Sequence, residues 1–253
     1  MHLSGYDLDM VNENLNPQDR GKRAAGFAAV DRLVRPGMKL GLGTGSTAKW
    51  AILRTAELFR DGELPGLLVV ATSFDTEMLA QSQGLPVRAL QDAEIEARLD
   101  LVIDGADELT ASLDCIKGGG GAHLQEKIVA DAAEVFALVA DASKLVPDLG
   151  TRFPIPLEVL PLARVSVIRA VQKWGGEAVL RFGQGKAGPV VTDNGNFLLD
   201  VRFASPVDPL EFSVKLKMLA GVLEVGLFPR RARWAFLGQD DGSVQILQNQ
   251  GRA

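Results

Sequence analysis

Four short apolar segments, each followed by a polar or glycine-rich turn and then by a helical pattern, constrain the fold of this chain most strongly. They read KLGLG, LLVVA, LDLVI and VFALVA and lie at residues 39–43, 67–71, 99–103 and 135–140. None alternates apolar and polar residues as a half-exposed strand does. Such segments, separated by helices, are typical of a parallel sheet that is covered on both faces. We therefore expect a doubly wound α/β domain.

Helix signals support this interpretation at both ends of the predicted helices. A first helix is expected from Asp19 to Arg35, where Pro36 and Gly37 end it. After the second strand, Ser73 is a suitable N-cap and Gly84 a suitable residue just beyond the helix C-terminus.

The pattern changes near residue 150, where the elements follow the order β-α-β-β-α-β of a ferredoxin-like α+β unit. They are expected at residues 155–159, 163–174, 178–182, 197–203, 209–220 and 222–225. A hairpin at 233–247, with the turn QDDG, follows them. We predict a flexible extension over residues 1–18, a first domain of 19–149 plus 228–253, and a second, smaller domain of 150–227.

Composition and charge exclude several classes of protein. The 253 residues include 27 Lys and Arg against 32 Asp and Glu, and the net charge of -5 disfavours nucleic acid and anionic membranes as partners. Cys115 is the single cysteine, so no intrachain disulfide can form. No apolar run reaches the roughly 18 residues that span a bilayer, and the N-terminus has no apolar signal segment. We expect a cytoplasmic protein.

Metal binding is constrained by the small number of soft ligands. His2, His123 and Cys115 are too few for a structural zinc site. An all-carboxylate magnesium site is not excluded by counting, so that alternative stays open.

Polar turns follow all four predicted strands, at residues 44–47, 72–73, 104–108 and 141–144. The strands of a parallel sheet end at one edge, and ligands bind in the crevice outside that edge. We therefore expect these turns to form one site. Separate solvated turns are the alternative.

The first of these turns, GLGTGST at 41–47, is a glycine-rich connection from strand to helix. Successive backbone N–H groups and a helix N-terminus suit a phosphate. The spacing matches neither G-x-G-x-x-G nor a Walker A loop, and the second strand ends in Thr72-Ser73 rather than in an acidic residue. The turn thus favours a small phosphorylated ligand over a dinucleotide, with a turn made only for helix packing as the alternative.

The motif DGADE places three carboxylates, those of Asp104, Asp107 and Glu108, just beyond the third strand. Clustered carboxylates repel one another, so a fold keeps them with partners or for a purpose. They suit sugar hydroxyls or a cation, and solvated acids in a turn are the alternative.

The stretch KGGGGAHLQEK at 117–127 contains four successive glycines. Their entropic cost is better explained by close approach of the backbone to a ligand than by packing, although a flexible surface loop is the alternative. A helix follows and carries Glu126 in its early turns, with Lys117 on the far side of the loop. A carboxylate beside a lysine and N–H donors suits proton abstraction next to a carbonyl.

Four other residues have ordinary interpretations when each is considered alone. His123 is interpreted as a partly exposed helix side chain rather than as a proton shuttle, and Cys115 as a small structural residue. Lys22 and Lys144 carry no functional signal by themselves, and only the motifs near them make them candidates for a site.

Taken in order, these motifs resemble the type A family of ribose-5-phosphate isomerases. The matching stretches include AAGFAAVDRLVRPGMKLGLGTGSTA, DLVIDGADEL, KGGGGAHLQEKIVADAA, VADASKLV and VVTDNGNFLLDV, and the similarity runs from about Asp19 to the end. The chain departs from the family at GAHLQEK, where GALLREK is expected. His123 thus replaces an apolar residue and Gln125 a basic one, and neither is a catalytic position of the family.

The resemblance implies an aldose-ketose isomerase that interconverts D-ribose 5-phosphate and D-ribulose 5-phosphate in the non-oxidative branch of the pentose phosphate pathway. It implies no metal and no organic cofactor, and a small-molecule substrate as the partner. It also implies a Rossmann-like domain that carries a smaller ferredoxin-like one, in a homodimer or homotetramer.

The resemblance further implies a role for each site residue. Glu126 is expected to transfer the proton, Asp104 and Asp107 to bind sugar hydroxyls and assist ring opening, and Lys117 to serve the enediolate or the phosphate. The residues expected to bind substrate are Lys22, Thr44, Gly45, Ser46, Thr47, Asp104, Gly105, Ala106, Asp107, Lys117, Gly118, Gly119, Gly120 and Lys144.

Two other classes of protein stay open. A sugar-phosphate sensor of the same fold would bind without turnover, but it would need a DNA-binding helix-turn-helix, and the residues before the first strand leave room for one convincing helix. A dinucleotide-dependent oxidoreductase would need the glycine fingerprint that is missing here. The combination of Lys117 and Glu126 favours an enzyme.

Overall fold

The computed structural model describes residues 15–185 and 187–249, and it divides into two compact units. Unit 1 comprises the chain up to Gly105, Ala132–Ala142 and the chain from Arg233; unit 2 comprises Ala106–Asp131 and Ser143–Ala232. Most of the predicted extension, residues 1–14, lies outside the described residues. The predicted domain boundaries near residues 150 and 228 stay a prediction.

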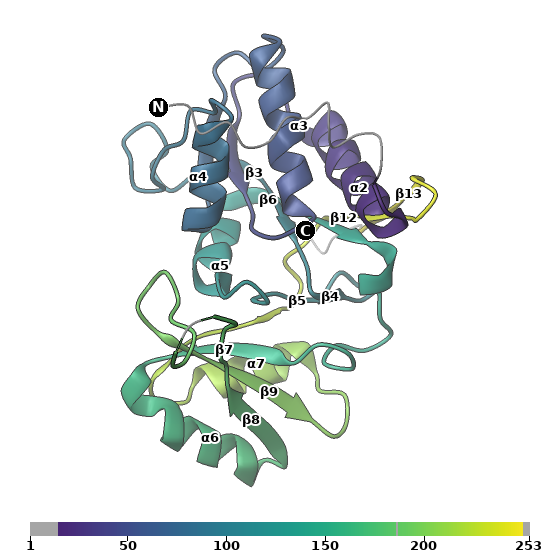
Figure 1. The fold of residues 1–253 in the computed structure, drawn as a ribbon. Helices are drawn as coiled ribbons and strands as arrows, with labels where there is room; N and C mark the ends of the chain where they lie inside the picture. Colours follow the sequence, from purple (N-terminus) through teal and green to yellow (C-terminus); the bar gives the residue numbers. More distant parts are fainter. Residues whose placement is uncertain (1–14, 186, 250–253) are drawn as a thin grey trace. The chain divides into compact units, whose positions relative to one another are not determined.

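A six-stranded sheet forms the centre of unit 1 (Figure 1). Its strands are hydrogen-bonded in the order β13-β12-β6-β3-β1-β2. Its strands are β1 (Lys39–Leu42), β2 (Leu68–Ala71), β3 (Leu99–Gly105), β6 (Ala133–Asp141), β12 (Trp234–Gly238) and β13 (Val244–Gln248). All neighbouring pairs are parallel except β12 and β13, which form an antiparallel hairpin. The predicted α/β class is therefore confirmed.

Three helices pack on this sheet, namely α2 (Pro17–Leu33), α3 (Ala48–Arg60) and α4 (Phe74–Ser82). Helix α2 starts two residues before the predicted start because Oδ1 of Asn16 accepts the N–H of Asp19 at 2.8 Å and Pro17 takes the first helical position. Ser73 caps α4 as predicted, with its Oγ accepting the N–H of Thr76 at 3.2 Å. Gly84 follows α4 with a φ of 79°, which favours glycine.

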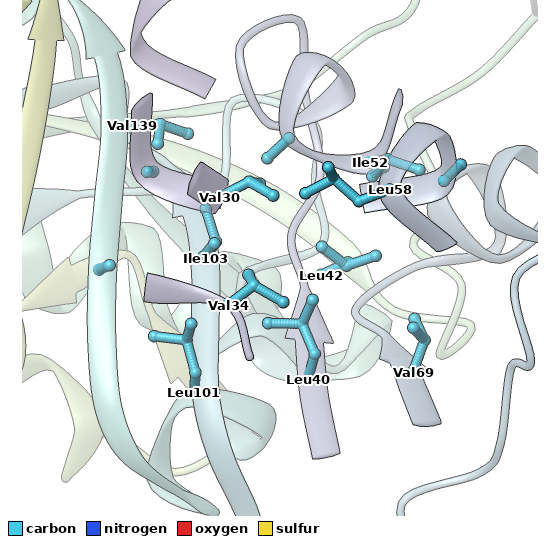
Figure 2. Close-up of a cluster of buried hydrophobic side chains, with 14 of the residues drawn as sticks. Val30, Val34, Leu40, Leu42, Ile52, Leu58, Val69, Leu101, Ile103 and Val139 are labelled. Carbon is cyan, nitrogen blue, oxygen red and sulfur yellow. The ribbon is translucent and has the colours of Figure 1, made fainter. Parts of the chain in front are cut away.

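The central sheet of unit 1 is buried on both faces, which explains why the strand sequences do not alternate. Leu101 and Ile103 belong to one core cluster, and Val102 between them is fully buried as well. Apolar side chains from the strands meet those of the helices in one buried cluster, which Figure 2 shows. The labelled members are Val30, Val34, Leu40, Leu42, Ile52, Leu58, Val69, Leu101, Ile103 and Val139. Burial of these side chains holds the strands in register beneath the helices, so the positions of the strand ends are fixed by packing.

Unit 2 contains a four-stranded antiparallel sheet with the order β10-β7-β9-β8. Its elements are β7 (Ile155–Val159), α6 (Arg164–Lys173), β8 (Gly176–Leu180), β9 (Phe197–Phe203), α7 (Pro209–Lys217) and β10 (Val222–Val225), with a short 3₁₀ helix at Pro161–Ala163. Another short 3₁₀ helix, Ala142–Lys144, spans the division between the units. The element order agrees with the predicted smaller α+β domain. Strand β8 begins two residues earlier than predicted, where Gly176 pairs with Phe203.

A second, three-stranded antiparallel sheet in unit 2 was not predicted. It consists of β4 (Glu108–Leu109), β5 (Cys115–Ile116) and β11 (Leu227–Phe228), in the order β11-β5-β4. Strand β5 leads directly to Lys117, and α5 (His123–Asp131) follows the glycine loop. This small sheet therefore positions the start of that loop.

Candidate active site

In unit 1, four hydroxyl side chains meet where β1 and β2 end. Thr44 Oγ1 lies 3.0 Å from Thr72 Oγ1 and donates to Ser73 Oγ at 2.7 Å, and Ser73 Oγ lies 3.2 Å from Thr76 Oγ1. Thr76 in turn donates to the carbonyl oxygen of Gly43 at 2.8 Å. Because each hydroxyl has one proton, the contacts form a directed chain from Thr72 through Thr44, Ser73 and Thr76 to that carbonyl. Thr76 was missed in the sequence because it lies in the first turn of α4, beyond the predicted polar turn at 72–73.

Asp104 joins the ends of β1 and β3. Its side chain is fully buried, and its Oδ1 accepts the N–H of Thr44 at 3.1 Å and that of Gly105 at 2.6 Å. A Cβ atom on Gly43 would lie 1.9 Å from the same oxygen, so only glycine fits there. The turns after β1, β2 and β3 are thus brought together, as predicted for one sheet edge. Asp141 ends β6 at that edge too, since β6 pairs in parallel with β3.

The turn after β1 leads into the N-terminus of α3. Gly45 has a φ of 108°, and Gly45 and Ser46 are exposed. Thr47 is the N-cap residue and is buried, without a side-chain capping bond in the described chain. The first N–H groups of a helix lack intrahelical acceptors and lie at the positive end of its dipole, which suits an anion such as phosphate.

In unit 2, Asp107 holds the glycine loop from one side. Its Oδ2 accepts the N–H of Gly119 at 2.7 Å, and a Cβ atom on Gly119 would lie 2.4 Å from its Oδ1. Gly118 and Gly121 have φ values of 105° and 78°, and the N–H of Gly121 donates to the carbonyl oxygen of Gly118 at 3.0 Å. Gly118 and Gly121 are therefore favoured by their backbone conformation, and Gly119 by the close approach of a carboxylate.

The side chains of Lys117 and Glu126 form a buried ion pair across this loop. Lys117 Nζ lies 3.3 Å from Glu126 Oε1, and the two side chains are 3% and 5% exposed. Glu126 lies in the first turn of α5, where the helix dipole favours a negative charge. The Nζ atom also lies 5.9 Å from the centre of the Phe228 ring. A carboxylate and an ammonium group held together out of water are suited to proton transfer and to stabilisation of a developing anion.

Lys127, the next residue on α5, was not singled out in the sequence. Its Nζ donates to the carbonyl oxygens of Val225 at 2.6 Å and Leu227 at 2.9 Å, and to Glu224 Oε1 at 2.8 Å. Burial lowers the pKa of Lys127 to about 8, although the charge of Glu224 opposes the shift. Lys127 thus ties α5 to the segment between β10 and β11.

His123 is fully buried, so its interpretation as a partly exposed side chain is wrong. Its Nε2 lies 3.3 Å from the carbonyl oxygen of Glu224, and its Nδ1 has no hydrogen-bond partner among the described residues. Burial, and then the charge of Lys127, lower its pKa to about 3, which keeps the ring neutral. A Cβ atom on Gly118 would lie 2.6 Å from this Nδ1, so the imidazole packs directly against the loop.

Glu108, the last acid of DGADE, orders a neighbouring segment of backbone. Its carboxylate accepts the N–H groups of Gly150 at 2.6 Å, Arg152 at 2.5 Å and Phe153 at 2.7 Å, and it is buried. The three carboxylates of this motif therefore make different contacts, and that of Glu108 is structural.

Lys22 and Lys144, also expected to bind substrate, are described by their own surroundings. Lys22, on α2, forms an ion pair with Asp19 at 3.2 Å. Lys144 ends the 3₁₀ helix after β6 and is partly exposed.

No cluster of three or more His, Cys, Asp and Glu side chains suited to a metal ion occurs within residues 15–185 and 187–249. Within the same part of the chain, no helix is long and apolar enough to cross a membrane.

Comparison with known proteins relates this arrangement to one family. The profile of ribose 5-phosphate isomerase A (phosphoriboisomerase A) matches residues 68–242. The chain belongs to the ribose 5-phosphate isomerase A family. The predicted resemblance is thereby confirmed, and with it the expected class of enzyme, an isomerase.

Curated relatives in the ribose 5-phosphate isomerase A family match almost the whole chain. The ribose-5-phosphate isomerase A of Thermosynechococcus vestitus is 47% identical over 228 residues, which cover 90% of this chain and 95% of the relative. That of Treponema denticola is 41% identical over 233 residues, with 89% and 98% covered.

Solved structures of ribose 5-phosphate isomerases also match. The enzyme from Methanocaldococcus jannaschii superposes with a TM-score of 0.84 at 42% identity and covers 90% of this chain and 98% of its own. That from Plasmodium falciparum gives 0.86 at 33% identity, with 92% and 100% covered. A D-ribose-5-phosphate isomerase in complex with phospho-erythronic acid gives 0.87 at 35% identity, with 92% and 99% covered. These likenesses confirm the predicted fold class.

Proposed function

We propose that this protein interconverts D-ribose 5-phosphate and D-ribulose 5-phosphate through an enediolate. The observation that carries the proposal is the buried pair of Lys117 and Glu126, 3.3 Å apart, at the two ends of the glycine loop. Removing both charges from water is costly, and apolar residues of similar size would stabilise the fold as well or better. The pair is therefore better explained by chemistry than by stability. The names of the relatives support the choice of substrate.

Glu126 is the base of the proposed reaction. Its carboxylate takes the C2 proton of the open-chain aldose, the C–H electron pair forms the C1–C2 double bond, and the carbonyl oxygen on C1 becomes an oxyanion. Lys117 donates a hydrogen bond to this oxyanion, a type of contact worth about 10²–10³ in rate. Glu126 then returns its proton to C1 while the proton of the C2 hydroxyl passes to the oxygen on C1, which gives the ketose.

Substrate binding is assigned to the remaining predicted residues. Gly45, Ser46 and Thr47, at the N-terminus of α3, bind the phosphate with Lys22 and Lys144 as further cations. The hydroxyl proton of Thr44 is already used within the hydroxyl chain, so Thr44 contributes chiefly by shaping the turn.

The sugar hydroxyls are assigned to the acidic and glycine loops. The residues of this group are Asp104, Gly105, Ala106, Asp107, Gly118, Gly119 and Gly120. Asp107 keeps acceptor capacity beyond its bond to Gly119, because a carboxylate has about four lone-pair positions.

Three further statements belong to this proposal. The reaction proceeds without a metal ion or an organic cofactor. It belongs to the non-oxidative branch of the pentose phosphate pathway. The protein acts in the cytoplasm, as a homodimer or homotetramer.

The test is proton NMR of D-ribose 5-phosphate in D₂O with the purified protein and EDTA. We expect resonances of D-ribulose 5-phosphate to appear with deuterium at C1, since a proton held by Glu126 exchanges with solvent. Turnover in EDTA would show that no dissociable metal is needed. Ligand-observed binding without conversion would instead indicate a sensor, and absence of both would refute the assignment of substrate.

A further inference from the structure

Arg181 joins the glycine loop to the four-stranded sheet of unit 2. Its Nη1 donates to the carbonyl oxygens of Gly118 at 2.8 Å and Gly119 at 3.0 Å. The other edge of the guanidinium pairs with Asp200 on β9 at two points, Nε to Oδ2 at 2.9 Å and Nη2 to Oδ1 at 2.5 Å. The side chains of Arg181 and Asp200 are 15% and 25% exposed, so these bonds are largely shielded from water.

The loop needs such a contact because its own sequence does not fix its conformation. Glycine loses more backbone entropy on ordering than any other residue, and four occur in succession here. The guanidinium binds the carbonyl oxygens of Gly118 and Gly119, while Asp107 accepts the N–H of Gly119 at 2.7 Å. The peptide groups around Gly119 are thus held both by a cation and by an anion.

We propose that Arg181 is a positioning residue for the isomerase reaction. By fixing the carbonyl oxygens of Gly118 and Gly119, it sets the path of the backbone between Lys117 and α5. That path determines where Lys117 Nζ lies against Glu126 and where Asp107 meets the loop. The inference rests on the proposed function, and Arg181 itself touches no reacting atom.

Asp200 is the counterpart that makes this role specific to arginine. The planar guanidinium reaches a carboxylate with one edge and carbonyl oxygens with its remaining N–H groups, which a lysine ammonium cannot do in the same geometry. Aligned by Asp200, the guanidinium cannot rotate without losing two charged bonds. The sheet of unit 2 therefore fixes the orientation of the donor that holds the loop.

The test compares Arg181→Met with the wild type in steady-state kinetics. Methionine keeps much of the apolar stem but has no donor. We expect kcat to fall about 10–100-fold, since small misplacements of catalytic groups cost up to about 10² in rate. KM for D-ribose 5-phosphate should rise by a smaller factor than kcat falls, because the loop is also assigned to the sugar hydroxyls, and inhibition by inorganic phosphate should be unchanged. Arg181→Lys should recover part of the loss.

Arg202→Met is the matched control, because Arg202 is exposed on β9 and bonds only weakly to the Arg152 carbonyl oxygen at 3.3 Å.

Amide hydrogen exchange provides a readout that is independent of activity. Exchange at the N–H groups of residues 118–121 should accelerate in Arg181→Met and remain at the wild-type rate in Arg202→Met. Asp200→Asn, which keeps the guanidinium and weakens its alignment, should show smaller changes of the same kind. It is the variant to measure if Arg181→Met does not fold.

The outcomes separate this inference from the proposed function. Wild-type kcat in Arg181→Met, a rise in KM alone, or a lower kcat with unchanged exchange at 118–121 would each overturn the positioning role. If the wild type does not convert D-ribose 5-phosphate, the proposed function fails. Hydrogen exchange still tests the Arg181 contact in that case, because unchanged exchange at residues 118–121 in Arg181→Met would show that this contact does not order the loop.

Discussion

His123, Glu126 and Lys127 lie within five residues on α5, and all three side chains are buried. Their surroundings give each a different task. Glu126 meets the ammonium of Lys117, Lys127 donates to two carbonyl oxygens and to Glu224, and His123 stays neutral against the loop backbone. One short helix thus carries a candidate base, a structural cation and a packing residue. Substitution of each should therefore have a different effect.

Replacement of Glu126 by glutamine should mainly affect the chemical step. Glutamine has nearly the same size but no basic oxygen, so kcat should fall by about 10²–10⁴, the usual contribution of a general base. KM should change much less. Glu134→Gln, the same change at an exposed position of β6, is the control and should leave kcat unaltered. Turnover at the wild-type rate in Glu126→Gln would exclude Glu126 as the base.

His123 should make the stability of the fold depend on pH. Its pKa is lowered from 6.5 to about 3 in the folded chain, chiefly by burial. As pH falls through this interval the unfolded chain gains a proton that the folded chain does not, so the free energy of unfolding decreases. In His123→Leu this contribution is absent, and stability should fall less steeply below about pH 6.5. Urea unfolding of both proteins across this pH range measures the slopes, and equal slopes would contradict the assignment.

At the scale of elements, Lys127 attaches α5 to the end of β10 and the start of β11. Lys127 Nζ contacts Val225 and Leu227 on either side of Gly226, and the ring of Phe228 lies 4.5 Å away. The N–H of Lys117 also donates to the carbonyl oxygen of Gly226, at 2.9 Å. Helix α5, the glycine loop and the three-stranded sheet of unit 2 therefore meet at the backbone around Gly226.

Loss of the Lys127 contacts should lower the free energy of unfolding more than loss of the surface ion pair between Lys217 and Glu224. Both lysines contact the same Glu224 carboxylate. Lys127→Met leaves two buried carbonyl oxygens without their donor, and the free energy of unfolding should fall by about 1–3 kcal/mol. Lys217→Met removes an ammonium that is 44% exposed, pairs with Glu224 and donates to the carbonyl oxygen of Leu223; because these contacts are exposed, its loss should cost less than about 1 kcal/mol. Urea titration of both variants measures the difference. Equal losses would mean that the carbonyl contacts of Lys127 contribute little.

The main elements could be predicted because burial leaves a pattern in the sequence. Non-alternating strands marked the parallel sheet, and cap residues such as Ser73 marked a helix end. Strands β4, β5 and β11 have two residues each, too few for any periodicity to show. The pairing of β11 with β5 also joins residues more than 100 positions apart, such as Phe228 and Cys115.

The candidate site was predictable only in part, for a related reason. Glycine runs and acidic clusters stand out locally, and they pointed to the loops around Asp104, Lys117 and Glu126. Arg181 and Lys127 are ordinary basic residues in the sequence, and their partners are reached only after folding. His123 was misjudged because nothing local shows that its ring lies under a glycine loop.

At the scale of the whole molecule, the chain passes from one unit to the other four times. The sheet of unit 1 is consequently built from segments at both ends of the sequence. Strand β12 pairs in parallel with β6 from Trp234 to Gly238, and Phe236 belongs to the buried core. Unit 1 therefore cannot complete its core from its N-terminal segments alone.

Two truncations test this dependence. A chain that ends at residue 242 lacks β13, an edge strand that is largely exposed, and should unfold cooperatively at a somewhat lower temperature than the full chain. A chain that ends at residue 232 also lacks β12, which leaves β6 as an open edge and removes Phe236 from the core. We expect this shorter chain to aggregate or to lack a cooperative transition in circular dichroism. A cooperative transition near that of the full chain would contradict the expectation.

The same connectivity has a consequence for the newly made chain on the ribosome. Unit 2 is complete in sequence at Ala232, before the strand that closes the sheet of the unit begun first. Between the synthesis of β6 and that of β12 lie about 90 residues, or roughly 5–20 s at ordinary rates of translation. Throughout this interval the nascent protein carries an uncovered strand edge. Synthesis of unit 1 thus begins before that of unit 2 but ends after it. A chaperone would protect the nascent chain most during this interval.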